Sequence, residues 1–412
     1  MRKTACILLI QLLTIGYCHA RILTIGSNQS FKTIQSALER AKDDDTLLVF
    51  PGTYAEGHLS IKKRICLLGF GQPILDGDFK YEVITILRDS VTIRGFHIQN
   101  SGVANLEDPG GLRIKGVSHV EVSNCFLTNN FFGIYLENAK ACRIQDNVVL
   151  SHGVSEEQIG NGIHAWKCDS LIITHNYVSG HRDGIYFEFV SNSIIWRNTS
   201  KQNVRYGLHF MFSNHDSYIT NTFHSNGAGV AVMFSNHVTM MNNKFLKNWG
   251  DASYGLLLKE ISDSHISGNK FLENTIGIYM EGTSRLEVNK NLFLKNGWGM
   301  QIQASCLENI ISQSNFQGNT FDISTNGSVV LNSFTTNYWE KYQGYDLDKN
   351  GIGDVPYRPL SLYSVLVEKN PTSMLLYNSL MVELIDQSEK IFPSLTPENF
   401  IDNSPAMKPF DL

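Results

Sequence analysis

The chain has 412 residues, of which 42% are hydrophobic and 18% are charged, and its formal net charge is −5. This hydrophobic content predicts a folded protein and argues against intrinsic disorder, because the chain can bury enough apolar surface to offset its loss of conformational entropy. The negative net charge argues against nucleic acid as a partner.

The first twenty residues have the pattern of a secretory signal peptide. Arg2 and Lys3 precede an apolar run from Ala5 to Ile15, and a small residue, Ala20, follows at the predicted cleavage site. The apolar run is too short to span a bilayer. We therefore predict a signal peptide over residues 1–20 and a mature protein that works outside the cytoplasm.

A repeat of 22 residues or slightly more runs through the middle of the chain. A glycine followed by an apolar residue recurs at gaps of 22, 29, 22, 23, 22, 26, 22 and 22 residues, and an asparagine follows each glycine by 13 to 16 residues. The glycines are Gly111, Gly133, Gly162, Gly184, Gly207, Gly229, Gly255, Gly277 and Gly299, and the asparagines are Asn124, Asn147, Asn176, Asn198, Asn221, Asn243, Asn269, Asn291 and Asn315. This period, with short alternating apolar runs, is typical of one coil of a parallel β-helix.

The predicted fold is an all-β, right-handed parallel β-helix of the pectin-lyase-like class over residues 21–335. Strand alternation places the residues one and three positions after each glycine inside the coil. The asparagines are interpreted as scaffold residues that bond from coil to coil. Phenylalanines two residues after an asparagine predict an internal aromatic column of Phe126, Phe223, Phe245, Phe271 and Phe293.

Both ends of the β-helix are predicted to be capped. Phe31, Ile34, Ala37 and Leu38 have helical spacing, which predicts an N-terminal cap helix over the open strand edge. From Asn332 the repeat is lost. Residues 336–360 form a predicted Asp/Gly-rich loop, and residues 361–412 form a predicted C-terminal docking segment.

The docking segment contains an apolar stripe at helical spacing, which predicts one helix over residues 373–392. A single helix cannot bury such a stripe alone, so it must pack on the β-helix or dock on a partner. The residues that we assign to docking are Met374, Leu375, Leu380, Met381, Leu384 and Ile385.

The predicted loop carries oxygen ligands at the spacing of a calcium loop. Asp346, Asp348, Asn350 and Asp354 supply the oxygens, with Gly351 at the turn. The bidentate glutamate that usually ends such a loop is absent, so an Asp/Gly-rich turn without metal remains the alternative.

Residues two and four positions after each glycine should form a double column on the outer face. In this column His209 and Met211 lie beside Met233 on one side and Glu188 on the other, with His164 two coils back. Imidazole and thioether suit copper, and thioether suits Cu(I) in particular. The alternative is that the methionines form a contact surface for a partner protein.

A second set of histidines competes with this assignment. His215 and His237 lie at equivalent turn positions one coil apart, with Asp263 in the same column. Two stacked histidines can hold a metal, although histidines at turns are commonly solvated polar residues.

Carbohydrate chemistry is the alternative function. The outer column carries Glu137, Glu188 and Glu281, none of them on neighbouring coils, whereas glycoside cleavage needs two carboxylates facing one bond. Asp183, Arg182 and Arg205 offer an alternative acid–base cluster, and Tyr135, Trp166, Tyr186 and Tyr279 offer a sugar-stacking platform. We assign no catalytic residue and expect no enzyme.

Several strings in the chain resemble the NosD family of nitrous oxide reductase maturation proteins. They are GHRDGIY at 180–186, RYGLHFMF at 205–212, GAGVAVM at 227–233, ASYGLLLKE at 252–260, NTFD at 319–322, GYDLD at 344–348 and PSLTPE at 393–398. Coils with repeated glycines occur in many secreted β-helices, but these longer strings are specific, and the resemblance covers nearly the whole mature chain.

The resemblance implies a periplasmic protein that handles copper, or copper and sulfur, transiently for the copper–sulfur centres of nitrous oxide reductase. The implied partners are an ABC-type permease with its ATPase, a copper-carrying lipoprotein and the reductase itself. The resemblance also implies that the C-terminal helix docks on the permease. It supplies no ligand set that can be placed residue by residue, so the metal residues above are inferred from the columns alone.

Overall fold

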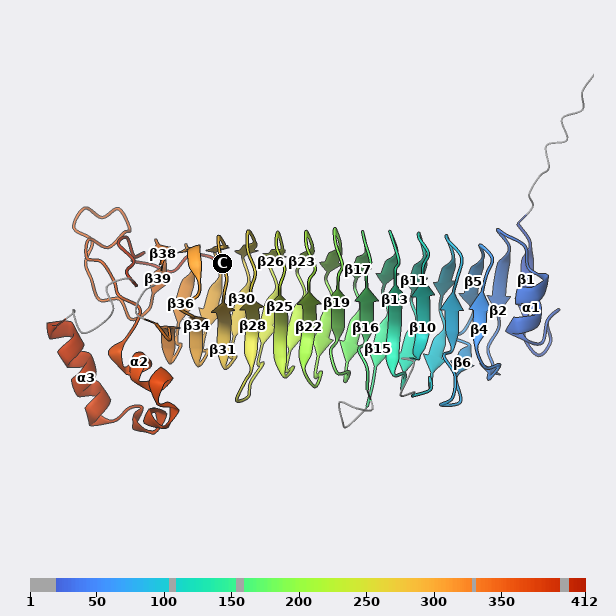
Figure 1. Cartoon of the computed structure of the whole chain (residues 1–412), viewed down its shortest axis with the longest axis horizontal. Helices are drawn as coiled ribbons and strands as arrows, with labels where there is room; N and C mark the ends of the chain where they lie inside the picture. The colour runs from blue at the N-terminus through green and yellow to red at the C-terminus, as the bar shows by residue number, and fades with distance from the viewer. Residues whose placement is uncertain (1–19, 104–108, 153–158, 328–330, 393–399) are drawn as a thin grey trace, which may run out of the picture.

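The computed structural model describes residues 20–103, 109–152, 159–327, 331–392 and 400–412. The predicted signal peptide lies outside the described residues except for Ala20, as does the string at 393–398. The described chain forms a parallel β-helix whose coils stack along one long axis, with α1 at one end and α2 and α3 at the other (Figure 1). The predicted fold class is confirmed.

Each coil contributes one strand to each of three parallel sheets, A, B and C. Sheet A contains β1 (Ile22–Ile25), β2 (Thr46–Val49), β5 (Cys66–Gly69), β8 (Thr92–Arg94), β11 (Glu121–Ser123), β14 (Arg143–Gln145), β17 (Ile172–Thr174), β20 (Ile194–Trp196), β23 (Ser217–Ile219), β26 (Thr239–Met241), β29 (His265–Ser267), β32 (Glu287–Asn289), β35 (Leu307–Ser312) and β38 (Leu331–Thr335). Sheet B contains β3 (Thr53–Tyr54), β6 (Ile74–Asp76), β9 (His97–Gln99), β12 (Phe126–Thr128), β15 (Val148–Leu150), β18 (Tyr177–Ser179), β21 (Thr199–Lys201), β24 (Thr222–His224), β27 (Lys244–Leu246), β30 (Lys270–Leu272), β33 (Leu292–Leu294), β36 (Asn315–Gln317) and β39 (Tyr338–Trp339).

Sheet C carries the glycine repeat and the outer column of candidate ligands. Its strands are β4 (Leu59–Ile61), β7 (Ile84–Ile86), β10 (Gly110–Lys115), β13 (Phe132–Glu137), β16 (Ile163–Trp166), β19 (Ile185–Glu188), β22 (Tyr206–Met211), β25 (Ala228–Met233), β28 (Tyr254–Lys259), β31 (Ile276–Glu281), β34 (Trp298–Ile302) and β37 (Phe321–Ser324). Successive repeats pair in the predicted register, as in Leu208 opposite Val230.

The core fills the inside of the coils, as the alternation of apolar residues predicts. Residues one and three positions after each glycine are fully buried from Ile134 to Ile302. The predicted aromatic column is present at Phe223, Phe245, Phe271 and Phe293, with neighbouring rings 4.6 to 5.5 Å apart, and it continues through Phe316 to Trp339. It excludes Phe126, which lies on the outer face of β12 while Leu127 points inward.

The asparagines form a hydrogen-bonded ladder inside the turn between sheets A and B. From Asn147 to Asn269, each backbone N–H and each side-chain amide donates to the Oδ1 of the asparagine one coil on, at 2.8 to 3.1 Å. Asn124 and Asn315 are not members, because Cys125 and Ser314 take the ladder positions in their coils. This one-residue shift is why Phe126 points outward.

A second ladder, which the sequence interpretation missed, lies at the turn between sheets B and C. Its members are Asn203, Asn226, Asn248, Asn274, Asn296 and Asn319, each five residues after a position of the first ladder. Two amide columns per coil therefore hold neighbouring coils in register. They satisfy backbone groups that the turns would otherwise leave without partners.

The two ends of the β-helix are capped differently. At the N-terminal end, α1 (Ile34–Arg40) buries Ile34, Ala37 and Leu38, which confirms the predicted cap helix. At the other end, β38 and β39 continue the coils beyond Asn332. Asp402, from the end of the chain, accepts hydrogen bonds from the backbone N–H of Asn337 and the indole N–H of Trp339, and so completes the first ladder.

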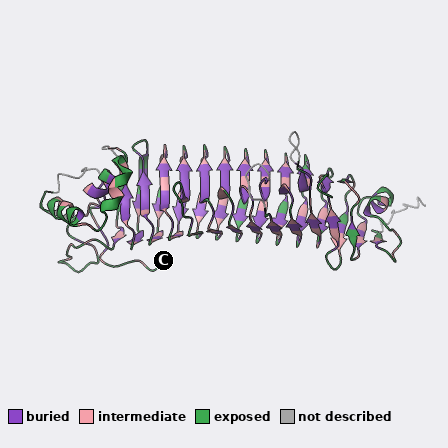
Figure 2. Cartoon of the chain, turned by 90° about the horizontal axis from the view of Figure 1, so that it is seen from below, coloured by how far each residue is buried: buried purple, intermediate pink, exposed green. Residues whose placement is uncertain are grey.

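The C-terminal segment contains two α-helices and a 3₁₀ helix rather than the single helix predicted over residues 373–392. These elements are α2 (Leu362–Lys369), η1 (Pro371–Leu376) and α3 (Leu380–Ile391). The break after η1 contains Asn378 at a φ of 61°, which interrupts helical geometry. Figure 2 shows that a larger part of these elements is exposed than of the strands in the coils. In the described part of the chain, no helix has the length and apolar character needed to cross a membrane.

Substitution of Asn243 by alanine should test the ladder. The change removes the acceptor for the backbone N–H of Asn221 and two donated hydrogen bonds, so we expect the free energy of unfolding to fall by about 2–4 kcal/mol. Thermal and urea unfolding should show this loss, while Lys244→Ala, at the exposed position next to it, should change stability by less than about 0.5 kcal/mol. Equal effects of the two substitutions would contradict a structural role for the ladder.

Candidate metal-handling site

Two methionine side chains lie next to each other on the outer face of sheet C. Met211 ends β22 and Met233 ends β25, and the two residues are direct partners in the parallel pairing. Both are partly exposed. Glu188 on β19 pairs with Met211 from the other side, and the hydroxyl of Tyr186 donates to the Met211 sulfur at 3.6 Å. The register predicted for Glu188, Met211 and Met233 is confirmed.

His209 differs from its predicted position on an exposed face. Its side chain lies on the outer side of sheet C, but the residue is only 4% exposed. The rings of Tyr186 and Tyr206 cover it, with centroids 4.9 and 4.7 Å from the imidazole. Aromatic residues in the same coil and in the neighbouring one therefore make this part of the outer face a second packed layer rather than a solvated surface.

His164 does not lie beside His209. Tyr186 stands between them in the column, and the three rings make tilted and edge-to-face contacts with neighbouring centroids 4.8 to 4.9 Å apart. The Nδ1 atom of His164 is 3.0 Å from the amide nitrogen of Asn161, so that ring nitrogen accepts a hydrogen bond. Burial lowers the pKa of His164 to about 3, which keeps it neutral near pH 7.

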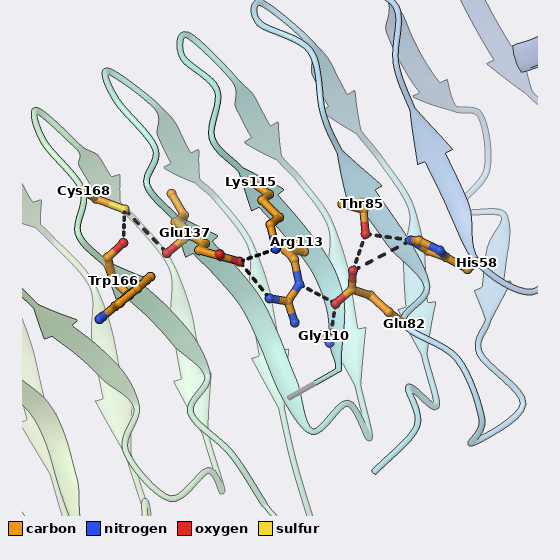
Figure 3. Close-up of polar contacts among 10 residues, drawn as sticks. His58, Glu82, Thr85, Gly110, Arg113, Lys115, Glu137, Trp166 and Cys168 are labelled. Atoms are coloured by element: carbon orange, nitrogen blue, oxygen red, sulfur yellow. Dashed lines mark hydrogen bonds and ion pairs between the residues drawn. The ribbon is translucent and has the colours of Figure 1, made fainter. Parts of the chain in front are cut away.

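The column ends in a charged network toward the N-terminus (Figure 3). Arg113 bridges Glu82 at 2.6 Å and Glu137 at 3.1 Å, Lys115 approaches Glu137 at 3.3 Å, and the Arg113 guanidinium lies 4.4 Å from the centre of the Tyr135 ring. Glu137 is thus bound by two cations.

The other glutamates of the column show no carboxylate pair for glycoside cleavage. Glu281 is 3.2 Å from Lys259. Trp166 separates Glu137 from Glu188 in the strand pairing, so these two carboxylates are not on adjacent strands. The outer column therefore does not place two glutamates side by side.

The turns that follow Met211 and Met233 have identical sequences, Met-Phe-Ser-Asn-His, at residues 211–215 and 233–237. The interpretation of the sequence overlooked this repeat, although two identical pentapeptides 22 residues apart are a visible signal. Ser213 and Ser235 are buried, and the Ser213 N–H donates to the Ser235 hydroxyl. His215 and His237 lie on the exposed side with rings stacked 4.7 Å apart.

An exposed phenylalanine column accompanies these turns. Phe189, Phe212 and Phe234 stack with centroids 5.2 and 5.1 Å apart, and each is between 39% and 47% exposed. All three have φ between 49° and 53°, a region that costs bulky side chains about 1–2 kcal/mol. Other coils place Lys167 or Glu260 at this position. Three phenylalanines at positions with a strained backbone and exposure to solvent indicate a contact surface.

Asp263 is not free to join His215 and His237. Its two carboxylate oxygens bind Arg285 at 2.6 and 2.7 Å. The Arg285 guanidinium and the hydroxyl of Ser262 hold the pKa of Asp263 well below its usual range. The structure therefore brings the two histidines together and directs this carboxylate to another partner.

The predicted calcium loop is stabilised by its own backbone. Asp346 accepts from the N–H groups of Asn350 at 3.1 Å and Gly351 at 2.8 Å, and Asp354 accepts from Leu347 at 2.7 Å. Asp348 also accepts from Asn350. Gly351 has a φ of 87°, which explains the glycine at this sharp turn. Calcium binding here stays a prediction.

Within the described residues, no group of three or more His, Cys, Asp or Glu side chains is placed to hold a metal ion. Methionine sulfur is a further ligand type, and it is the type that the outer face of sheet C presents in register. A soft ion such as Cu(I) is the metal that thioethers select.

Comparison with known proteins finds similarity to one family of periplasmic proteins. Residues 150–344 match the family described as "Periplasmic copper-binding protein (NosD)", a span that includes both methionines and both turns. Two relatives named "Probable ABC transporter binding protein NosD" align over almost the whole chain. The one from Pseudomonas aeruginosa is 26% identical over 90% of this chain and 90% of its own length, and the one from Stutzerimonas stutzeri is 27% identical over 94% and 92%. The chain is thus similar to NosD proteins over nearly its whole length.

Solved structures show that the chain shares its fold with enzymes. The catalytic unit of an α-1,3-glucanase from Streptomyces thermodiastaticus superposes with a TM-score of 0.60 and 12% identity over 76% of this chain and 66% of that one. An exopolygalacturonase from Yersinia enterocolitica superposes with a TM-score of 0.53 and 11% identity over 77% and 78%. At these identities the likeness concerns the fold alone.

A buried carboxylate directly follows the Met-Phe-Ser-Asn-His turn at residues 211–215. It predicts that the free energy of unfolding depends on pH. Asp216 follows His215 and is fully buried; its Oδ1 accepts from the Ser193 N–H at 2.8 Å, and its Oδ2 has no partner in the described chain. Burial raises the pKa of Asp216 to about 8. An unfolded aspartate loses its proton near pH 4, so Asp216 makes the folded state less stable as pH rises from about 4 to 8.

Asp216→Asn keeps the acceptor but carries no titratable proton. We expect this change to raise the melting temperature at pH 8 by more than it does at pH 5, when thermal unfolding is followed at both values. Asp146→Asn, the same change at an exposed turn, serves as the control. A gain for Asp216→Asn that is equal at the two pH values would show that this carboxyl does not titrate in the folded protein.

Proposed function

We propose that this chain is a periplasmic accessory protein that handles copper during the maturation of nitrous oxide reductase, without catalysing a reaction itself. The observation that carries the proposal is the pair of thioethers of Met211 and Met233, which lie in register on a family region described as copper-binding. Their partial exposure allows a cargo ion to enter and leave. The twin Met-Phe-Ser-Asn-His turns extend the same surface.

The partners follow from the family and from the C-terminal helices. The relatives are named as ABC transporter binding proteins, so we assign this chain an ABC-type permease with its ATPase as a partner. A copper-carrying lipoprotein supplies the cargo, and nitrous oxide reductase receives it. Copper, with or without sulfur, is the transient ligand.

The docking surface is the exposed side of η1 and α3. Leu375, Leu380, Met381 and Leu384 are between 59% and 89% exposed. Two of the residues that we assigned to docking, Met374 and Ile385, pack instead against a small core around Phe321, Tyr363 and Val382. The helices are therefore anchored through one side and leave an apolar side for a partner.

Anaerobic titration with Cu(I) against a chromophoric chelator should test copper handling. Wild type should bind Cu(I), and Met211→Leu with Met233→Leu should weaken binding by a factor of ten or more, which corresponds to about 1.4 kcal/mol. Leucine keeps the size and apolar character but removes the sulfur. Met241→Leu, at a partly exposed position on sheet A, is the matched control and should bind as wild type does.

Two results would defeat this assignment. One is the absence of Cu(I) binding by the wild type, which would remove the proposed function. The other is unchanged affinity in the double leucine variant, which would place copper elsewhere on the chain.

Leu380→Glu with Leu384→Glu should test docking, because two charges on the apolar side of α3 oppose burial against a permease. We expect loss of co-purification with the membrane permease and an unchanged melting temperature. A glutamate placed elsewhere, in Ile194→Glu on the exposed face of sheet A, should retain the complex. Deletion of the whole tail is unsuitable, since Phe400 and Asp402 cap the last coil. A permease complex that survives both glutamates would refute docking through α3.

A further inference from the structure

Buried polar atoms without partners are concentrated at one place in the molecule. Ten buried side-chain nitrogen and oxygen atoms in the described chain have no hydrogen-bond partner, and six of them belong to His181, Arg182, Asp183 and His209. Each such atom costs about 1–3 kcal/mol. Elsewhere the ladders satisfy the turns almost completely, so this cluster is an exception that a purely structural role does not explain.

His209 is covered by aromatic side chains within this cluster. Its ring lies between Tyr186 and Tyr206, and neither ring nitrogen has a hydrogen-bond partner in the described residues. Two residues along the same strand, Met211 points to the same face, and Met233 pairs with Met211 from the next coil. The imidazole and the two thioethers therefore share the outer face of sheet C.

Asp183 is held opposite His209 by hydrogen bonds to its neighbours. Its N–H donates to the Oδ1 of Asn161 at 3.3 Å, and its own Oδ1 accepts from the N–H of Tyr206 at 3.2 Å. The remaining oxygen, Oδ2, is 3.6 Å from the Nδ1 of His209. This separation is too long for a hydrogen bond but close enough for the carboxylate charge to act on the ring.

The carboxylate selects one of the two neutral tautomers of His209. If Nδ1 carries the proton, its N–H points toward a negative charge; if Nε2 carries it, a lone pair points toward that charge. The first arrangement is favoured, and it leaves the lone pair on Nε2. Metal-binding histidines commonly have this arrangement, in which a carboxylate orients the ring from its far side.

We infer that Asp183 is a positioning residue that keeps His209 in the Nδ1–H tautomer, so that Nε2 can act as the nitrogen ligand beside the Met211 and Met233 thioethers. The inference rests on the proposed function for the metal and on the Asp183–His209 geometry for the tautomer. It adds to the candidate site a residue that ligand chemistry alone does not identify, because Asp183 does not touch the ion.

The tautomer can be measured without copper. Protein labelled with ¹⁵N histidine should show, in long-range proton–nitrogen spectra, a protonated Nδ1 and an unprotonated Nε2 for His209, with His209→Ala used to assign the signals. In Asp183→Asn, the side-chain amide can accept the Tyr206 N–H through its oxygen and donate to the ring through its nitrogen. The His209 proton should then move to Nε2. The same Nδ1-protonated form in both proteins would overturn the inference.

Copper affinity provides a second, independent test, because the inference predicts that Asp183→Asn weakens Cu(I) binding more than Asp183→Ala does. Asp183→Asn should weaken Cu(I) binding about 10- to 100-fold. Asp183→Ala, which imposes neither tautomer, should weaken it less. Stability should rank the other way, because alanine leaves the Tyr206 N–H without its acceptor whereas asparagine keeps it. A structural role alone would make Asp183→Ala the more damaging variant in both measurements, and that result would refute a positioning role.

The outcomes separate this inference from the proposed function. If wild type binds no Cu(I), the proposed function fails, while the nitrogen spectra still report on the tautomer. If wild type binds Cu(I) and His209→Ala weakens it but both Asp183 variants bind normally, copper handling stands and the role of Asp183 is wrong.

Discussion

The register between successive coils is the constraint on which the rest of this structure depends. Backbone hydrogen bonds join each strand to its equivalent one coil away, and the two asparagine ladders lock the turns at the same spacing. A slip by one residue would turn every inward side chain outward. Because the register is fixed, a residue type repeated every 22 positions forms a continuous column. A candidate site therefore arises from repeated residues on neighbouring coils rather than from loops that are distant in the sequence.

The outer column of sheet C shows what such a scaffold can support. Rings from Tyr135 to His209 follow one another along the coils in tilted and edge-to-face contacts, with centroids 4.7 to 4.9 Å apart, so the face carries a second packed layer. Beside it lie a strained, exposed phenylalanine column and a cluster of buried polar atoms that lack partners. A stiff array of coils can bear these local costs in stability, and their concentration around β19, β22 and β25 indicates a functional region there.

The C-terminal region combines two tasks in a short stretch of chain. Phe400 and Asp402 close the last coil, where an open strand edge and the end of the asparagine ladder would otherwise meet solvent. In the sequence, α2 and α3 come after the last coil and before this cap, and they are anchored by a small core that includes Phe321 and Val382. The apolar side that remains exposed is therefore held rigidly at one end of a long molecule, far along the axis from the N-terminal cap (Figure 1).

The repeat made much of the fold predictable. Regular glycines and asparagines define the coil, and alternation within each strand then determines which side chains form the core, because a strand has only two faces. The pairing of Met211 with Met233 followed from the same repeat, whereas the N-terminal helix followed from the helical spacing of its apolar residues. Phe126 was assigned to the wrong face, since Asn124 looks like a ladder residue in the sequence but Cys125 occupies that position in three dimensions.

Other features depended on contacts that no spacing specifies. The position of a residue in a column indicates on which face of the sheet it lies, but not which side chains cover it. Only the tertiary structure showed that Tyr186 and Tyr206 bury His209, and that Tyr186 separates His209 from His164. The approach of Asp183 to His209 and the pairing of Asp263 with Arg285 were likewise decided by side-chain packing between coils. The sequence by itself determined the coil, its register and its interior, because these follow from a repeat. The tertiary structure alone decided which outer side chains are covered and which polar atoms remain without partners, because that depends on how neighbouring residues of different size and charge fill the same surface.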